Sequence, residues 1–256
     1  MLKDYNEKKY ITYSQKMLVS LLFVRPQRYD SGEKDEVENM ELISKAELVK
    51  EYEVNASFYR LKFDDKVFDC RNRAIIRRIG VNQEYYDAVF ILVNPGSCHP
   101  EMQDSIQYKN PLHGEIPLIG AESDSTQCQI MRLMKLREWK QVCIINLSDL
   151  CSGNLDNFKS LLEDAKRLSY TYHSIFSKER SKELNQIIHA NKGPFIVGWG
   201  TKDFIKPLAN KALQSHSSVQ PVVGWQHNIK PFYYHPNQRL KEGKIEWLQR
   251  LNTLLA

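Results

Sequence analysis

Three short apolar runs stand out along the chain, and each is followed by a polar or glycine-containing turn. They cover 88–93, 142–147 and 195–199, and a shorter run follows at 222–225 or 231–234. Continuous apolar runs of this length are typical of strands that are buried on both faces of a parallel sheet. We therefore predict central parallel strands at these positions.

Segments with helical periodicity separate the runs and predict an α/β protein. Asp124 stands three residues before Gln127, which favours a capping box at the start of the first of these helices. Strands that alternate with helices imply a doubly wound sheet. We expect a three-layer α/β/α sandwich with a mostly parallel central sheet. One predicted helix begins at Asp124-Ser125 and carries Ile130, Leu133, Met134 and Leu136; the others cover 154–168, 177–189, 202–214 and the segment around 245–251.

The N-terminal part of the chain has a different pattern. Residues 36–52 have apolar positions at roughly helical spacing, and we interpret them as an amphipathic helix. This helix would belong to an N-terminal extension, 1–54, packed on an α/β domain at 55–256. The stretch 57–70 alternates around Asp64-Asp65-Lys66, which predicts a β-hairpin at the edge of the sheet.

A long segment, 97–123, follows the Asn-Pro-Gly turn at 94–96 and is rich in Pro, Gly, Asp and Ser. Connections of this length without secondary structure usually have a function. Open α/β sheets bind ligands beyond the carboxyl ends of their strands. We therefore expect the turn to take part in a site and 97–123 to form its rim.

Composition narrows the class of protein. With 42% hydrophobic residues in 256, the chain can bury a large core, which excludes a disordered or fibrous protein. The formal net charge of +5 permits a phosphate-bearing partner without requiring one. The five cysteines form no CxxC pair, and no apolar run reaches the ~20 residues of a spanning helix. We expect a cytoplasmic protein with reduced thiols, no cofactor and no membrane partner, and we leave its oligomeric state open.

Four short motifs follow one another at predicted strand ends and in a late loop. They are Val93-Asn94-Pro95-Gly96, Ile145-Asn146-Leu147, Gly198-Trp199-Gly200 and His235-Pro236-Asn237. In this order they resemble the uracil-DNA glycosylase superfamily, over about residues 88–240. A closer likeness is to a bacterial and phage family of no established activity, which has an L-N-P strand end, a D-P-T helix start and a W-G strand. Asp124-Ser125-Thr126 occupies the place of that helix start.

The resemblance implies roles for individual residues. Asn94 matches the residue that positions or activates the attacking water, Asn146 the residue that reads the edge of a flipped base, and His235 the residue that stabilises charge on the departing base. These residue types suit the chemistry, because an Asn offers both a donor and an acceptor, and a fixed donor beside the base acts where charge develops. The further candidates for substrate binding are Pro95, Gly96, Tyr108, Trp199, Asn237 and Arg239.

Three functions stay open. The first is a nucleic-acid base N-glycosidase or a related nucleotide-directed hydrolase, with DNA or a nucleotide as its partner. The second is a nucleic-acid-binding protein on the same fold without turnover, and the third is a small-molecule or nucleotide sensor that uses the strand-end turn as an anion nest. Arginines between 71 and 78 either face phosphates or form a solvated helix face. They are Arg71, Arg73, Arg77 and Arg78.

Purely structural interpretations are also open for the candidate catalytic residues. Asn94 can serve the turn before Pro95, and Asn146 can cap a turn at its strand end. His235 can be a packed core histidine among its aromatic neighbours.

Overall fold

The computed structural model describes residues 41–102, 106–216 and 221–256. Residues 42–256 form one compact unit. Most of the predicted N-terminal extension, residues 1–40, therefore lies outside the described residues. Within the described part, α2 (Lys45–Glu51) begins with a capping box between Ser44 and Glu47. The boundary expected between 54 and 55 falls inside the following strand, β1 (Tyr52–Phe63).

The four predicted central strands are confirmed, and neighbouring members of the set pair in parallel. They are β3 (Ala88–Leu92), β7 (Gln141–Asn146), β8 (Phe195–Val197) and β9 (Val222–Val223). β3 pairs with both β7 and β8, and β8 pairs with β9. Every residue of β3 and β7 is buried, as expected for strands covered on both faces.

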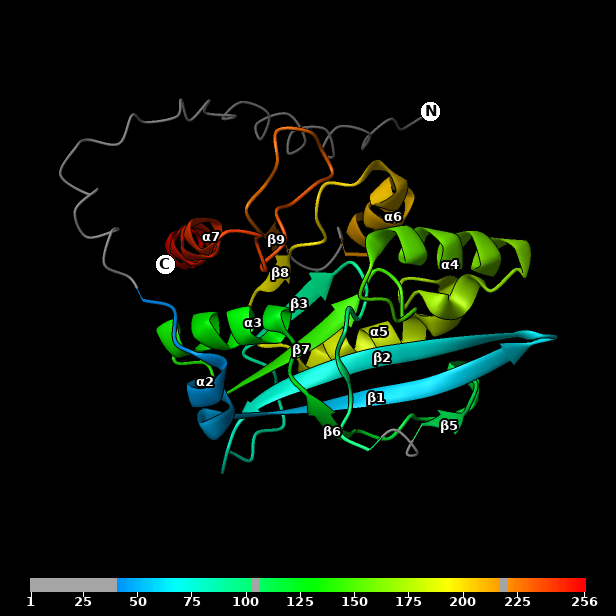
Figure 1. Cartoon of the computed structure of the whole chain (residues 1–256), viewed down its shortest axis with the longest axis horizontal. Coiled ribbons are helices and arrows are strands. Elements are labelled where there is room, and N and C mark those ends of the chain that lie inside the picture. Colours follow the sequence, from blue (N-terminus) through cyan, green and yellow to red (C-terminus); the bar gives the residue numbers. More distant parts are fainter. Residues whose placement is uncertain (1–40, 103–105, 217–220) are drawn as a thin grey trace, which may run out of the picture. The chain divides into compact units, whose positions relative to one another are not determined.

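The expectation of a mostly parallel sheet is wrong. In the described residues the sheet has nine strands in the order β4-β6-β1-β2-β7-β3-β8-β9, with β5 paired to β1, and it is mixed (Figure 1). β1 pairs antiparallel with β2 (Lys66–Arg78), and β2 pairs antiparallel with β7. Three short strands complete this half: β4 (His99–Pro100), β5 (Gln107–Tyr108) and β6 (Ile119–Glu122).

The predicted hairpin exists and turns at Asp64, but it does not lie at the edge of the sheet. β2 is hydrogen-bonded to β7 on one side, and β1 is hydrogen-bonded to β6 on its own outer side. Alternation near the turn indicated a half-exposed hairpin. Further along, both strands contain continuous buried stretches, because tertiary packing covers both of their faces there. The arginines between 71 and 78 therefore lie on a strand, and the helical interpretation is wrong.

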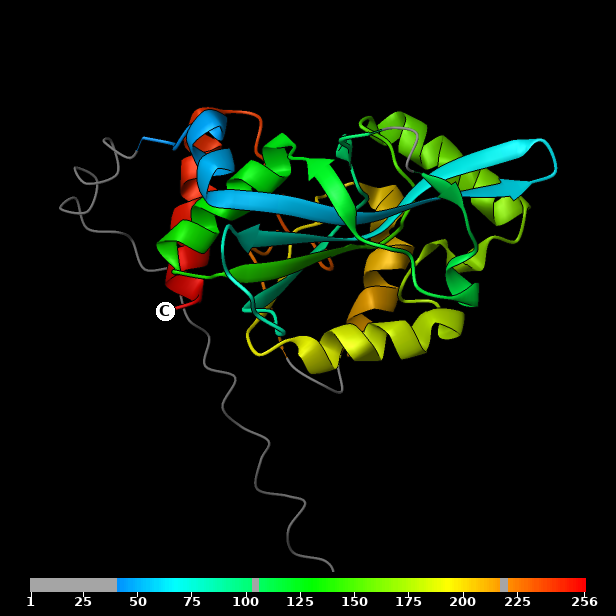
Figure 2. The ribbon, with the colours of Figure 1, turned by 90° about the horizontal axis from the view of Figure 1, so that it is seen from below.

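Helices cover both faces of the sheet (Figures 1 and 2). One core joins Phe90 and Ile144 to residues of α2, α3 and α7. The other joins Ile91 and Ile145 to residues of α4, α5 and α6. The predicted helices are confirmed to within a few residues. Their bounds are α3 (Ser125–Leu136), α4 (Leu155–Arg167), α5 (Ser181–Ala190), α6 (Lys206–His216) and α7 (Lys241–Leu254).

Single turns of 3-10 helix occur at η2 (Pro111–His113), η3 (Thr171–His173), η4 (Lys178–Arg180) and η5 (Asp203–Ile205). Among the helices that the structure describes, none is long and apolar enough to span a bilayer.

Candidate functional site

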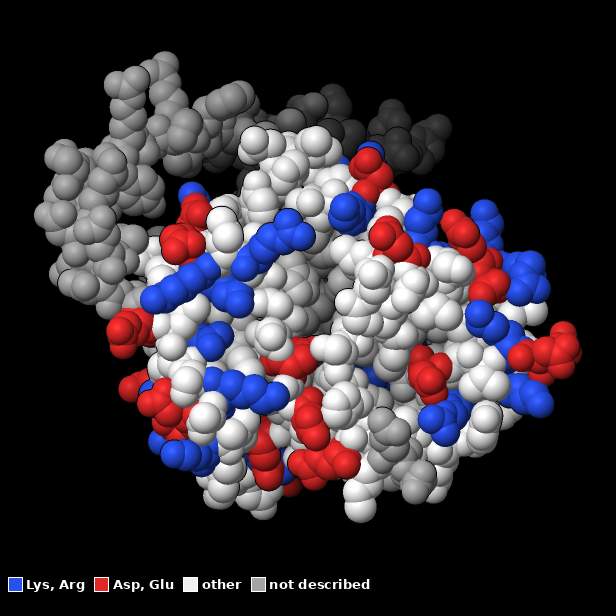
Figure 3. Space-filling model, in the orientation of Figure 1, with Lys and Arg blue, Asp and Glu red and all other residues white. Residues whose placement is uncertain are grey.

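A cleft of about 760 Å³ lies at the carboxyl ends of the parallel strands. Its wall comprises the turn after β3, the segment after β8, the first residues of α3 and the segment 234–239. Figure 3 shows this face hollowed between α3 and α4, with lysine and arginine side chains beside the hollow. The volume is in the range of pockets that bind small molecules and cofactors.

Most of the predicted site residues line this cleft. They are Asn94, Pro95, Gly96, Trp199, His235, Asn237 and Arg239. They come from three separate stretches of sequence, so tertiary structure brings them together as the strand-end placement predicts. Trp199 is 2% exposed and donates its indole N–H to the carbonyl of Pro231, so its ring is mostly a core group.

Tyr108 does not reach the cleft. It lies on β5 opposite Arg60 of β1, and its side chain is 63% exposed. The expectation that 97–123 forms the rim is also wrong, since Ser97 is the only described residue of that range in the cleft wall. The range instead supplies β4, β5 and β6, because its backbone hydrogen bonds are satisfied by pairing at the edge of the sheet.

Asn94 both supports the cleft and faces it. Its side-chain N–H donates to the carbonyl of Ser152 at 2.7 Å and, at 3.5 Å, to that of Leu150. The amide thereby ties the turn after β3 to the segment that follows β7. Its Oδ1 has no hydrogen-bond partner among the described residues and remains available to a ligand or to a water molecule. The turn-forming role and the ligand-binding role are thus compatible.

Gly96 brings this turn against the start of α3. Its φ is +68°, and a Cβ at this position would lie 3.1 Å from Oδ2 of Asp124. The other carboxylate oxygen of Asp124 accepts hydrogen bonds from the backbone N–H groups of Thr126 and Gln127, each at 2.9 Å. The predicted capping box is therefore confirmed. It fixes a carboxylate in the cleft wall.

His235 has a defined protonation pattern. Its Nδ1 accepts a hydrogen bond from the backbone N–H of Asn237 at 3.2 Å, so the neutral ring carries its proton on Nε2. Burial lowers the pKa of His235, although the nearby Asp124 carboxylate opposes that shift. At neutral pH the residue is therefore an uncharged hydrogen-bond donor through Nε2.

The loop that carries His235 packs directly on the strand end of β8. A Cβ on Gly198 would lie 2.9 Å from Cδ of Pro236 and 3.3 Å from the carbonyl oxygen of Tyr234. Only a glycine permits this approach without displacing the loop. The Gly198-Trp199-Gly200 motif therefore positions His235.

Asn146 lies next to the cleft but not in its surface. It is fully buried, and neither Nδ2 nor Oδ1 has a hydrogen-bond partner within 41–102, 106–216 and 221–256. Because side chains alternate along a strand, Asn146 shares the sheet face of Ile144, which lines the cleft. A role in reading a base requires this amide to become accessible when a ligand enters.

Arg71 was one of four arginines expected either to face phosphates or to form a solvated helix face, and Asp124 was expected as a helix cap. Both line the cleft. The described cleft wall contains three cationic side chains and one carboxylate. The cations are Arg71, Lys202 and Arg239, and the carboxylate is Asp124. When His235 is neutral, the local net charge of +2 favours an anionic ligand.

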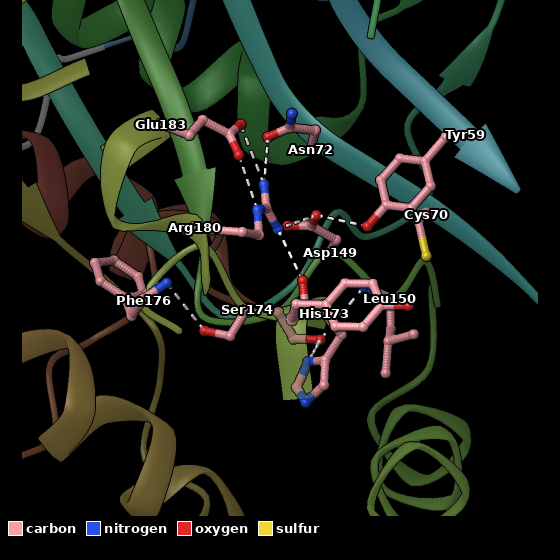
Figure 4. A network of polar contacts seen from close by, with 12 residues as sticks. Tyr59, Cys70, Asn72, Asp149, Leu150, His173, Ser174, Phe176, Arg180 and Glu183 are labelled. Atoms are coloured by element: carbon pink, nitrogen blue, oxygen red, sulfur yellow. Dashed lines mark hydrogen bonds and ion pairs between the residues drawn. The ribbon is translucent and has the colours of Figure 1, made fainter. Parts of the chain in front are cut away.

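A buried polar network holds the loop after β7 (Figure 4). Arg180 donates to Asp149 Oδ2 at 2.5 Å, to Glu183 Oε2 at 2.8 Å and to Asn72 Oδ1 at 2.8 Å. Tyr59 donates its hydroxyl to the same Asp149 oxygen at 2.8 Å. Burial raises the pKa of Asp149, against the lowering effect of the Arg180 guanidinium. This network anchors the loop whose Ser152 carbonyl binds Asn94.

Comparison with protein-family models, with curated proteins and with solved structures finds no match to this chain. Within the described ranges, no three His, Cys, Asp or Glu side chains lie close enough together to hold a metal ion. The chemistry of the cleft residues is therefore the basis for a functional conclusion.

Proposed function

We propose that the cleft binds a nucleotide unit and hydrolyses its N-glycosidic bond. The observation that carries this proposal is the presence of Asn94 and His235 in one cleft, each with one polar atom that no other described residue hydrogen-bonds. The motif resemblance to uracil-DNA glycosylases supports the same chemistry. The net positive charge of the wall fits a phosphate-bearing substrate.

The residues divide the work between the two sides of the bond. Cleavage builds positive charge on the sugar and negative charge on the departing base. His235, donating through Nε2, stabilises the charge on a base oxygen or nitrogen. Asn94 Oδ1 holds the water that attacks the sugar. The bond breaks between the sugar carbon and the base nitrogen, the water oxygen bonds to that carbon, and the base leaves with the electron pair.

An asparagine cannot accept the proton of the attacking water, because its amide has no accessible pKa. Asp124 is the carboxylate of the described cleft wall. Its Oδ2 has no hydrogen-bond partner among the described residues and faces the turn of Gly96. We assign proton acceptance to Asp124 within this proposal.

The test is a base-release assay on labelled oligonucleotides that contain uracil, hypoxanthine or modified cytosines, together with free nucleotides. His235→Asn and Asn94→Ala should each lower the rate by about 100-fold, the usual effect of losing one such group. His113→Asn is the matched control, since His113 is exposed on η2 and lies outside the cleft wall. Base release that survives both cleft substitutions would refute the assignment.

Binding without turnover is the second candidate. Asn94 favours it, because its N–H group already serves the fold and its side chain cannot act as a base. A binding isotherm on the same oligonucleotides and nucleotides separates the two candidates. Saturable binding with no released base would favour a nucleotide sensor or a nucleic-acid-binding protein over a hydrolase.

A further inference from the structure

A buried guanidinium lines the cleft without an ionic partner among the described residues. Arg71 on β2 is 2% exposed, and its Nε and Nη1 have no hydrogen-bond partner in the part of the chain that the structure describes. No ion pair between described residues includes Arg71, whereas its strand neighbour Arg73 pairs with Glu115 at 2.9 Å. Arg71 nonetheless forms part of the cleft wall.

Arg180 shows how the same fold treats a structural arginine. Its side chain is 1% exposed, and two carboxylates, of Asp149 and Glu183, lie within 2.8 Å of it. Such pairing is expected, because a charge removed from water is costly unless an anion or several acceptors replace the water. Arg71 has no such compensation from the described residues, so its partner must come from the cleft.

A second unpaired group lies at the same end of the neighbouring strand. β2 and β7 are paired through Ala74 and Ile144, and the backbone N–H of Arg71 donates to the carbonyl of Asp149 beyond the end of β7. Asn146 is the last residue of β7, and neither polar atom of its amide has a hydrogen-bond partner among the residues that the structure describes. Two adjacent strand ends thus contribute buried polar groups to which no other described residue is hydrogen-bonded through the side chain.

We infer that Arg71 binds a terminal oxyanion of the ligand, a phosphomonoester or a carboxylate. The planar guanidinium matches two oxygens of such a group at once. The oxyanion must be a terminal group. In an internal phosphodiester the nucleic-acid strand continues on both sides of the phosphate, and such a strand cannot pass an arginine as deeply buried as Arg71. That the ligand is a nucleotide rests on the proposed function, but the need for an oxyanion does not.

Titration calorimetry compares the four nucleoside 5′-monophosphates with the corresponding nucleosides. At least one monophosphate should bind tenfold or more tightly than its nucleoside, and inorganic phosphate should compete with it. If acetate competes with the nucleotide and inorganic phosphate does not, the site binds a carboxylate. An oligonucleotide with a 5′-phosphate should compete better than the same oligonucleotide with a 5′-hydroxyl.

Arg71→Met and the matched control Arg73→Met separate binding from structure. Arg71→Met should abolish the preference for the monophosphate over the nucleoside while leaving the thermal midpoint of the free protein unchanged or raised, because an unpaired buried charge is removed. Arg73→Met should keep the preference. If Arg71→Met does not fold, the Nε–H signal of Arg71 in nitrogen-15 spectra, assigned with Arg71→Lys, should shift on addition of phosphate.

Equal affinity for every monophosphate and its nucleoside would overturn the inference, as would a lower thermal midpoint of Arg71→Met with the phosphate preference intact. An Nε–H signal that does not respond to either anion would do the same. These readouts do not depend on turnover. Phosphate-dependent binding without base release would therefore reject the hydrolase and retain the oxyanion site. Base release without phosphate-dependent binding would reject the oxyanion site and retain the hydrolase.

Discussion

The buried network around Arg180 makes a quantitative prediction about stability. Arg180→Met removes a guanidinium that is 1% exposed and leaves Asp149, which is fully buried, without its cation. Glu183, with a side chain 20% exposed, can turn towards solvent, but Asp149 cannot. Removing one partner of a buried pair typically costs about 3–5 kcal/mol of unfolding free energy. We expect a loss in this range, limited by protonation of Asp149, whose pKa rises further without the cation.

Urea unfolding followed by tryptophan fluorescence measures this loss, since Trp199 and Trp247 are almost completely buried. Arg167→Met is the matched control. Arg167 pairs with Asp164 at 3.0 Å, but its side chain is 65% exposed, so its removal should cost less than about 1 kcal/mol.

A double-mutant cycle with Asp149→Asn tests whether the two residues act together. The double variant should lose less stability than the sum of the single variants, because Asp149→Asn removes the charge that Arg180→Met strands. A loss below about 1 kcal/mol for Arg180→Met, or strict additivity in the cycle, would refute the view that this network anchors the loop after β7.

Two further predictions concern the cleft and its supports. Gly96→Ala should destabilise the protein by about 1–2 kcal/mol in thermal unfolding, because φ is +68° and the new Cβ approaches Asp124. Gly80→Ala is the control, because Gly80 has φ +79° and open space around it, so this substitution measures only the cost of the backbone conformation. Equal losses of stability in the two variants would exclude a contribution from the contact with Asp124. Burial lowers the pKa of His173 to about 4. Between pH 6.5 and 4 the unfolded state therefore binds a proton that the folded state does not. The free energy of unfolding should fall by about 2–3 kcal/mol as the pH drops through this window. His173→Asn can keep a hydrogen bond to Ser148 and should lack this pH dependence of the unfolding free energy. An unchanged pH dependence in this variant would assign the effect to other groups.

Local patterns in the sequence were sufficient for the parallel strands and the helices. β3 and β7 are continuous apolar runs because both of their faces are covered, and the Asp124 cap with the periodicity that follows it predicts where α3 begins. The turn of the hairpin at Asp64 was also predicted correctly. These features depend on neighbours close in sequence, and composition and spacing therefore specify them.

The place of the hairpin in the sheet was decided by tertiary structure. Alternation near the turn describes only the end of the hairpin, while its pairing with β6 and β7 depends on segments that are distant in sequence. The same reason explains why the expectation that 97–123 forms the rim of the cleft is wrong. The range 97–123 lacks periodicity because it forms very short strands against the sheet edge, and pairing partners rather than local propensity determine such strands.

For the site, the sequence by itself determined which strand ends would meet, because the carboxyl ends of parallel strands share one edge of a sheet. It could not determine which polar groups the fold would leave unused. Within the described part of the chain, Asn94 has one amide atom bound and one unpaired, His235 has a fixed tautomer, and Arg71 is buried without a counter-ion. Each of these states depends on distances to residues elsewhere in the chain. A hydrogen-bonding group is satisfied or left unpaired by three-dimensional packing, which the order of residues does not state.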